Sequence, residues 1–113
     1  LRGLVKLVMD GKHTYVDNSS GAPTISSGGG TGVTIAGADS AFEITVGTGS
    51  PTSVVVNFAN TWPSTPQIAI AQCSQAGANL YVTALSTTQI TIDSNGTGLS
   101  SGVKIRVIVM GLQ

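Results

Sequence analysis

The first residues of this chain that could carry out chemistry surround its single histidine. His13 lies three residues after Asp10 and four residues before Asp17, with Ser19 and Ser20 close behind. A serine, histidine and aspartate triad or an autoprocessing site needs these residue types, but such sites are defined by geometry and not by closeness in sequence. No strand-to-helix turn that could form a nucleophile elbow accompanies these residues. A surface histidine in a hairpin is therefore the favoured interpretation.

The other reactive side chains are isolated from one another. Cys73, the only cysteine, lies in an alternating segment with no base near it, which is typical of a buried structural thiol. Asp39 and Glu43 flank a turn and would suit a glycosidase pair, but carboxylates so placed are more often solvated. The run 93–97 resembles the start of a calcium loop without its distal glutamate. We expect no catalytic residue, no metal ligand and no cofactor.

Aromatic side chains offer a different chemistry, the recognition of sugars. Trp62, Tyr81 and Tyr15 could stack on sugar rings, while the polar loops supply hydrogen bonds. The alternative is that Trp62 plugs the end of the core and that the tyrosines are ordinary sheet residues. The core plug is the favoured interpretation for Trp62, and the two interpretations are evenly balanced at Tyr81. These three residues form the predicted carbohydrate-binding set.

Composition excludes several classes of partner. Of the 113 residues, 41% are hydrophobic and only 9% are charged, and the formal net charge is zero. A nucleic-acid footprint needs clustered Lys and Arg, and an anionic membrane surface attracts the same residues. No apolar run is long enough to span a bilayer. We therefore expect one domain without nucleic-acid binding or membrane insertion, and the start at Leu1 suggests a fragment or processed product of a longer protein.

The middle of the chain has an unusual surface. No charged residue occurs between Glu43 and Asp93. Natural sheets usually protect their exposed edges with charges, prolines, bulges or covering elements. Here Ser, Thr, Asn and Gln are the only polar residues available, so either the sheet closes on itself or other copies of the chain cover it.

The elements follow a regular plan of short strands. The segments 1–9 and 12–16 flank Asp10-Gly11, a strong hairpin signal. The segments 53–58 and 66–73 read as two strands joined by a corner that contains Trp62 and two prolines. Strands at this spacing without a helical period predict an all-β, antiparallel sandwich. We place a boundary between a stalk or hairpin segment, 1–27, and a sandwich domain, 28–113.

The last expected strand, Val103 to Met110, has two contrasting faces. Val103, Ile105, Val107 and Val109 share one face, because side chains alternate along a strand. The other face begins with Lys104 and Arg106 and ends with Ile108 and Met110. A strand of this kind is expected to be covered from both sides at its far end.

Two segments resemble the C-terminal region of bacteriophage tail-fibre and tailspike proteins. The first, 30–49, follows their pattern G-x-x-x-x-I-x-G-x-D-x-A-x-x-I-x-x-G-T-G, here with Ile35, Asp39 and Ile44. The second, 56–66, follows V-x-F-x-x-x-W/F-x-x-x-P, here with Trp62. Residues before Gly28 lie outside the resemblance, and these patterns encode turns and a core plug rather than chemistry.

This resemblance implies a trimeric, jelly-roll-like β-sandwich cap at the tip of a phage tail protein in the virion. Such domains trimerise and stabilise the fibre, and some bind bacterial surface polysaccharide. Depolymerase activity, where such proteins have it, usually lies in an upstream β-helix, so this chain is not expected to be an enzyme. The competing hypotheses are a lectin-like receptor-recognition module, a hydrolase or autoprocessing domain using His13, and a releasable folding chaperone, which the lack of helices disfavours.

Overall fold

The structure is a computed structural model that describes residues 7–9, 14–16 and 21–111. Within these ranges the chain forms ten strands and no helix, so no helix there could cross a membrane. The strands are, in order, β1 (Leu7–Met9), β2 (Thr14–Val16), β3 (Thr24–Gly28), β4 (Thr34–Ala38), β5 (Ala41–Thr45), β6 (Ser53–Asn57), β7 (Ile68–Cys73), β8 (Tyr81–Leu85), β9 (Gln89–Asp93) and β10 (Lys104–Met110).

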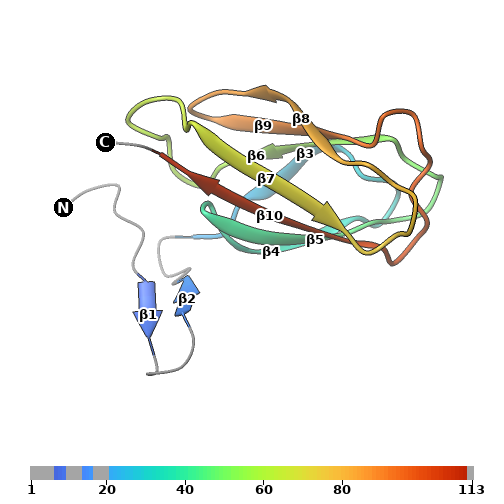
Figure 1. The fold of residues 1–113 in the computed structure, drawn as a ribbon, viewed down its shortest axis with the longest axis horizontal. Coiled ribbons are helices and arrows are strands. Elements are labelled where there is room, and N and C mark those ends of the chain that lie inside the picture. The colour runs from blue at the N-terminus through green and yellow to red at the C-terminus, as the bar shows by residue number, and fades with distance from the viewer. Residues whose placement is uncertain (1–6, 10–13, 17–20, 112–113) are drawn as a thin grey trace.

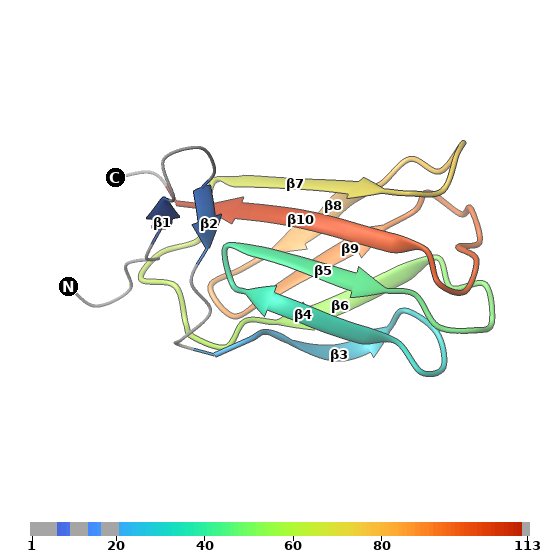
Figure 2. The same ribbon diagram turned by 90° about the horizontal axis from the view of Figure 1, so that it is seen from below.

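Eight of these strands form two antiparallel sheets that pack face to face (Figures 1 and 2). One sheet has the order β4-β5-β10-β7 and the other has the order β3-β6-β9-β8. The antiparallel β-sandwich predicted from the sequence is confirmed. Strands β6 and β7, which the sequence analysis joined by a corner, lie in different sheets, so this corner carries the chain from one layer to the other.

Alternation of side chains explains the core between the sheets. Strands β5, β6, β9 and β10 are the central strands, and on each of them every second residue is buried. The pairing register aligns Ile35, Ile44 and Ile105 in one row of the first sheet. It aligns Val56 with Ile90 in the second sheet. These rows face each other and exclude water, which is the main stabilising contribution in a sandwich of this size.

The two ends of the sandwich differ in what they carry. Strand β3 begins and strand β10 finishes at the same end, on the left in Figure 1, where the corner 58–67 also lies. The opposite end holds the four loops 29–33, 46–52, 74–80 and 94–103. The described part of the chain therefore enters and leaves the sandwich at one end, and the four loops lie at the other end.

Asp39 fixes the corner to the first sheet. It lies in the turn between β4 and β5, and its two carboxylate oxygens accept the amide N–H groups of Ala59 and Asn60 at 2.7 and 2.9 Å. Hydrogen bonds to a carboxylate are stronger than those between neutral groups. The aspartate of the pattern in the sequence therefore has a structural role that joins the two layers.

The N-terminal hairpin is present as an antiparallel pair of β1 and β2, as predicted. It projects from the end where β3 begins (Figures 1 and 2). The predicted boundary between residues 27 and 28 stays a prediction, but β3 crosses it, because Thr24–Gly28 pairs with β6 inside the sandwich. His13 and the Asp10-Gly11 turn lie outside the described residues.

Candidate interaction surfaces

The outer face of the β4-β5-β10-β7 sheet is apolar at one end. Met110 lies opposite Ile68, and Ile108 lies opposite Ile70 on β7 and Ala41 on β5. Directly opposed residues of antiparallel strands point to the same side of the sheet. These side chains therefore form one continuous group, which we call the apolar strip: Ile68, Ile70, Ile108 and Met110.

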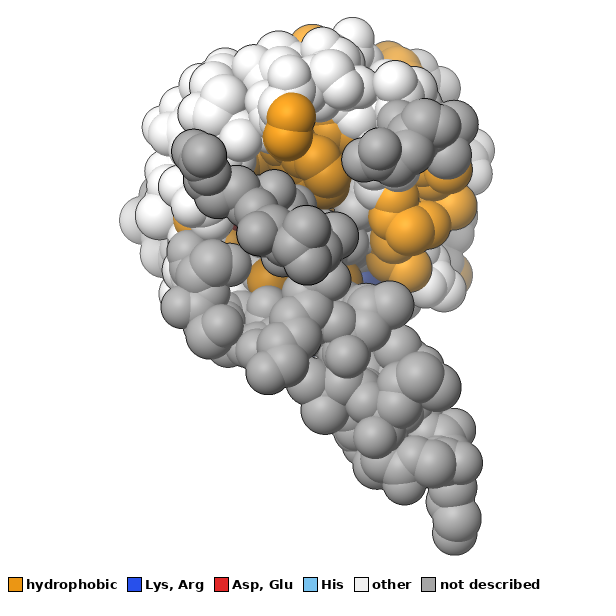
Figure 3. Space-filling view, turned by 90° about the vertical axis from the view of Figure 1, so that its left-hand side faces the viewer, with side chains coloured by type: hydrophobic (Ala, Val, Ile, Leu, Met, Phe, Trp, Pro, Cys, Tyr) orange, Lys and Arg blue, Asp and Glu red, His pale blue; other side chains and the backbone are white. Residues whose placement is uncertain are grey.

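Water reaches most of the apolar strip. Ile70 is 61% exposed, and Ile108 and Met110 are each 48% exposed. Figure 3 views the end where β10 finishes, and a group of hydrophobic side chains lies on its right-hand side, where this outer face is seen edge-on. A shallow groove of about 400 Å³ extends from Ile70 and Ile108 toward Ala36, and Glu43, Gln72 and Arg106 also line it. Contiguous exposed apolar groups on a small domain mark a site of interaction.

The opposite half of the same face carries ions of both signs. Arg106 donates a hydrogen bond from Nε to Glu43 at 2.9 Å, and Lys104 Nζ lies 3.9 Å from the other oxygen of Glu43. Lys104 also donates to Thr45 Oγ1 at 2.7 Å. All three charged side chains are 39–57% exposed, so their pairing contributes little to stability. The cluster leaves one positive charge in excess.

The edges of the two sheets are protected differently. None of the four edge strands, β3, β4, β7 and β8, carries a charged residue. In the β3-β6-β9-β8 sheet both edge strands have a bulge, between Ile25 and Ser27 and between Val82 and Ala84. Strands β4 and β7 pair with their neighbours in regular register. The sheet with the apolar strip is therefore also the one whose edges lack a device against association.

The outer face of the β3-β6-β9-β8 sheet has the opposite character. Asn57 and Gln89 lie opposite each other, and the Gln89 amide donates to Asn57 Oδ1 at 2.7 Å. Thr91 and Ser53 also point outward, because Ile90, Ile92 and Val54 next to them are buried. Most of the side chains on this face are polar, with Val55 on β6 and Tyr81 on β8 among the exceptions.

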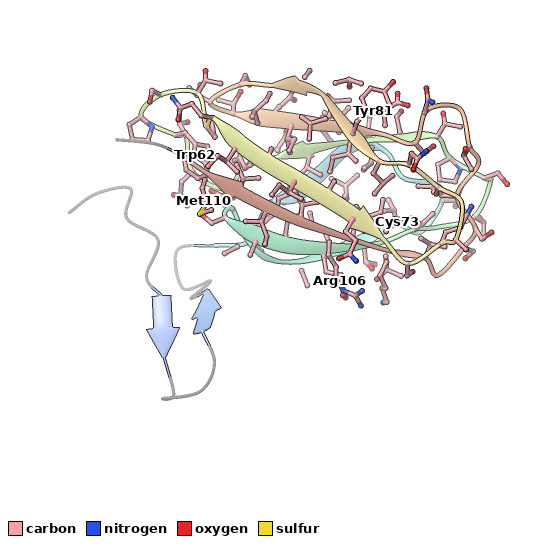
Figure 4. The ribbon with its side chains drawn as sticks, viewed as in Figure 1. Trp62, Cys73, Tyr81, Arg106 and Met110 are labelled. Atoms are coloured by element: carbon pink, nitrogen blue, oxygen red, sulfur yellow. The ribbon has the colours of Figure 1, made fainter. Side chains whose placement is uncertain are left out.

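Trp62 lies at the end where the chain enters and leaves (Figure 4). Its ring meets Phe58 edge to face, with 5.8 Å between ring centroids, and it packs against the core. Its backbone N–H donates to Thr87 O at 2.9 Å, whereas its buried indole Nε1 has no hydrogen-bond partner in the described part of the chain. These contacts are those of a core plug. The sugar-stacking role of Trp62 stays a prediction.

The two tyrosines are placed apart from Trp62. Tyr81 begins β8 and is 46% exposed on the outer face of its sheet. Figure 4 places it toward the loop end, away from Trp62. Tyr15 lies in β2, but its side chain is outside what the structure describes. Trp62 and Tyr81 therefore do not form one aromatic platform.

The remaining candidate groups have structural surroundings. Cys73 lies half-buried against the core, and its sulfur accepts the N–H of Gln75 at 3.3 Å. Asp39 and Glu43 have different partners, as described above. Asp93 accepts the N–H of Asn95 at 2.7 Å, the turn geometry expected for the run 93–97. Within the described ranges, no group of three or more potential metal ligands is found.

Sequence reasoning found one half of the apolar strip and missed the other. It recognised the apolar far end of β10, because alternation along a single strand shows it. It did not recognise Ile68 and Ile70, because their alignment with β10 depends on a pairing between strands more than thirty residues apart. The signal was the alternation in β7, whose first two outward residues, Ile68 and Ile70, are apolar and only the third, Gln72, is polar.

Comparisons with protein-family models, with curated proteins and with solved structures found no match.

Proposed function

We propose that this protein is a self-associating structural domain, the C-terminal trimerisation and stabilising domain of a phage tailspike or tail fibre. The observation that carries this proposal is the apolar strip on the outer face of β7 and β10. Three exposed aliphatic side chains on one sheet face are costly in water, and burying them between copies of the chain removes that cost. The assignment to a phage tail and the expectation of three copies rest on the resemblance of 30–49 and 56–66 to tail-fibre and tailspike proteins.

Several features favour another copy of the chain as the partner. The unprotected edges β4 and β7 flank the same face that carries the strip. The face holds both signs of charge in Glu43, Lys104 and Arg106, so Glu43 of one copy can pair with a basic side chain of another. Interfaces of permanent oligomers are more apolar than ordinary surface, which agrees with a chain that is only 9% charged.

The mass of the protein in solution tests this proposal. Light scattering on a sizing column, repeated by native mass spectrometry, should give three times the chain mass of 11.3 kDa at micromolar concentration. The assembly should persist at 1 M salt, because screening weakens ion pairs and leaves apolar contacts intact. A stable monomer at micromolar concentration would contradict the proposal.

A lectin-like receptor-recognition module is the second candidate, and the exposure of Tyr81 favours it. An aromatic side chain that remains in water on a polar sheet face is available for stacking on a sugar. The two candidates are compatible, since the polar face stays in water when copies cover the opposite one. We therefore include contact with bacterial surface polysaccharide in the proposal.

A further inference from the structure

The loop end of the sandwich is uncharged throughout. Its four loops, 29–33, 46–52, 74–80 and 94–103, contain no Lys, Arg, Asp or Glu. They are rich in Gly and in Ser, Thr, Asn and Gln, whose side-chain hydroxyl and amide groups both donate and accept hydrogen bonds. Loops held at one end of a β-sandwich are a common place for recognition sites.

Hydrogen bonds between the loops make this end a fixed surface. The Gln75 side chain joins two loops, because its Nε2 donates to Gly98 O at 3.1 Å and its Oε1 accepts the Ser100 N–H at 2.8 Å. Ser94 is buried and donates its N–H to Thr52 O at 2.8 Å, and Leu99 N–H donates to Pro51 O at 2.9 Å. Binding to a surface that is already ordered costs little conformational entropy.

One aromatic side chain and one carboxylate lie side by side at the margin of this end. Tyr81 on β8 lies directly opposite Asp93 on β9. Ser53 on β6, the other neighbour of β9 in the sheet, also lies opposite Asp93. All three point outward, since the next residues, Val82, Ile92 and Val54, belong to or pack against the core. Asp93 uses Oδ1 for the Asn95 N–H and has no ion-pair partner among the described residues.

We propose that Tyr81 and Asp93 form a subsite for a neutral saccharide unit of a surface polysaccharide. This inference rests on the glycan contact in the proposed function and names its location and its ligand class. The C–H face of a sugar ring packs on the exposed phenol ring, and hydroxyl groups of the same sugar donate to the Asp93 carboxylate. Ser53 adds a hydroxyl beside that carboxylate.

The charge of the site selects the ligand. The loops hold no cation, and the subsite holds one carboxylate, so a uronic or sialic acid brings a second negative charge without a counterion. Phosphate groups are disfavoured for the same reason. A neutral hexose or hexosamine supplies hydroxyl donors to the carboxylate and meets no such repulsion.

The location of the subsite also fits the proposed assembly. Tyr81 and Asp93 lie on the polar face, away from the apolar strip on the other sheet, and each copy of a trimer keeps one accessible subsite. A single subsite of this size binds weakly, but several sites on one particle gain strength through multivalency. Trp62, at the opposite end, takes no part in it.

The test uses the whole chain and an array of oligosaccharides in two groups, one neutral and one bearing uronic or sialic acids. Binding is expected in the neutral group. For the strongest neutral oligosaccharide, Tyr81→Ala should weaken binding at least tenfold, on the scale of a lost stacking contact, whereas Tyr81→Phe keeps the ring and should stay within threefold. Asp93→Asn should weaken binding several-fold, because it removes the carboxylate that accepts the sugar hydroxyls. Its side-chain amide oxygen can still accept the Asn95 N–H, so the turn is preserved.

Three outcomes would overturn the subsite: no binding to the neutral group, stronger binding to the acidic group, or unchanged binding after Tyr81→Ala. The mass of each variant is measured in parallel and should equal that of the wild type. A trimer that fails to bind neutral oligosaccharides contradicts only the subsite, whereas a monomer that binds them through Tyr81 contradicts only the assembly.

Discussion

Replacing Ile70 and Ile108 together by serine should convert the assembly into monomers that remain folded. Both side chains point away from the core, so the sandwich loses little on their replacement. Each serine should weaken the free energy of association by roughly 1 kcal/mol. Each isoleucine is about half exposed in the single chain, and this exposed half is what the interface would bury. Six such replacements in a trimer total on the order of 6 kcal/mol, which is about four powers of ten in the association constant.

Val55→Ser is the matched control for this double replacement. Val55 is half-buried on the outer face of the other sheet, on the central strand β6, and has a similar branched side chain. Light scattering should show the control at the wild-type mass and the double variant at the mass of one chain, with circular dichroism unchanged in both. Retention of the wild-type mass by the Ile70→Ser and Ile108→Ser variant would place the interface elsewhere.

Gly47→Ala should destabilise the domain strongly. A methyl group at position 47 would lie 2.6 Å from the carbonyl carbon of Thr31 and 2.9 Å from the amide nitrogen of Val33. Both are backbone atoms of the crossing loop, and the Gly47 N–H donates to Gly29 O at 2.9 Å. The loops must therefore separate, at a cost of about 3 kcal/mol. At fixed protein concentration, the melting temperature should fall by roughly 12–20 °C.

Gly49→Ala separates steric crowding from backbone strain. Gly49 has a φ of 104°, which disfavours any side chain, but apart from its two chain neighbours no heavy atom of the described residues lies within 4 Å of the methyl group that alanine would add. Gly47 has no such positive φ, so its substitution is costly only through contact. The control should lose about 1–2 kcal/mol. A Gly47→Ala variant no less stable than Gly49→Ala would show that the loop crossing at Thr31 is not tightly packed.

Much of the sandwich could be predicted because its signals are local. Alternation in 89–93 and 103–110 identified the buried faces of β9 and β10, and the prolines around Trp62 identified the corner between layers. The strand order could not be predicted, because β5 pairs with β10 across about sixty residues and no local pattern records that choice. The bulges in β3 and β8, which distinguish the edges of the two sheets, depend on the same long-range pairing.

The candidate surfaces were predictable only in part, for the same reason. The sequence identified Trp62 and Tyr81 as candidate sugar-binding aromatic residues. It did not show that they lie toward opposite ends of the sandwich. Asp93 was read as part of a turn, and its position opposite Tyr81 appears only once β8 and β9 are in register. Asp39 was assigned to a solvated turn, whereas it holds the amide groups of the corner from twenty residues away.

The rate at which dilute hydrogen peroxide oxidises Met110 tests most directly whether other copies cover the apolar strip. Oxidation to the sulfoxide requires that the reagent reach the sulfur, and Met110 is 48% exposed in the single chain. Peptide mass spectrometry should show Met110 reacting several times more slowly in the wild type than in the Ile70→Ser and Ile108→Ser variant at equal concentration. Equal, fast oxidation in both proteins would mean that the strip is open to solvent and that the assembly does not bury it.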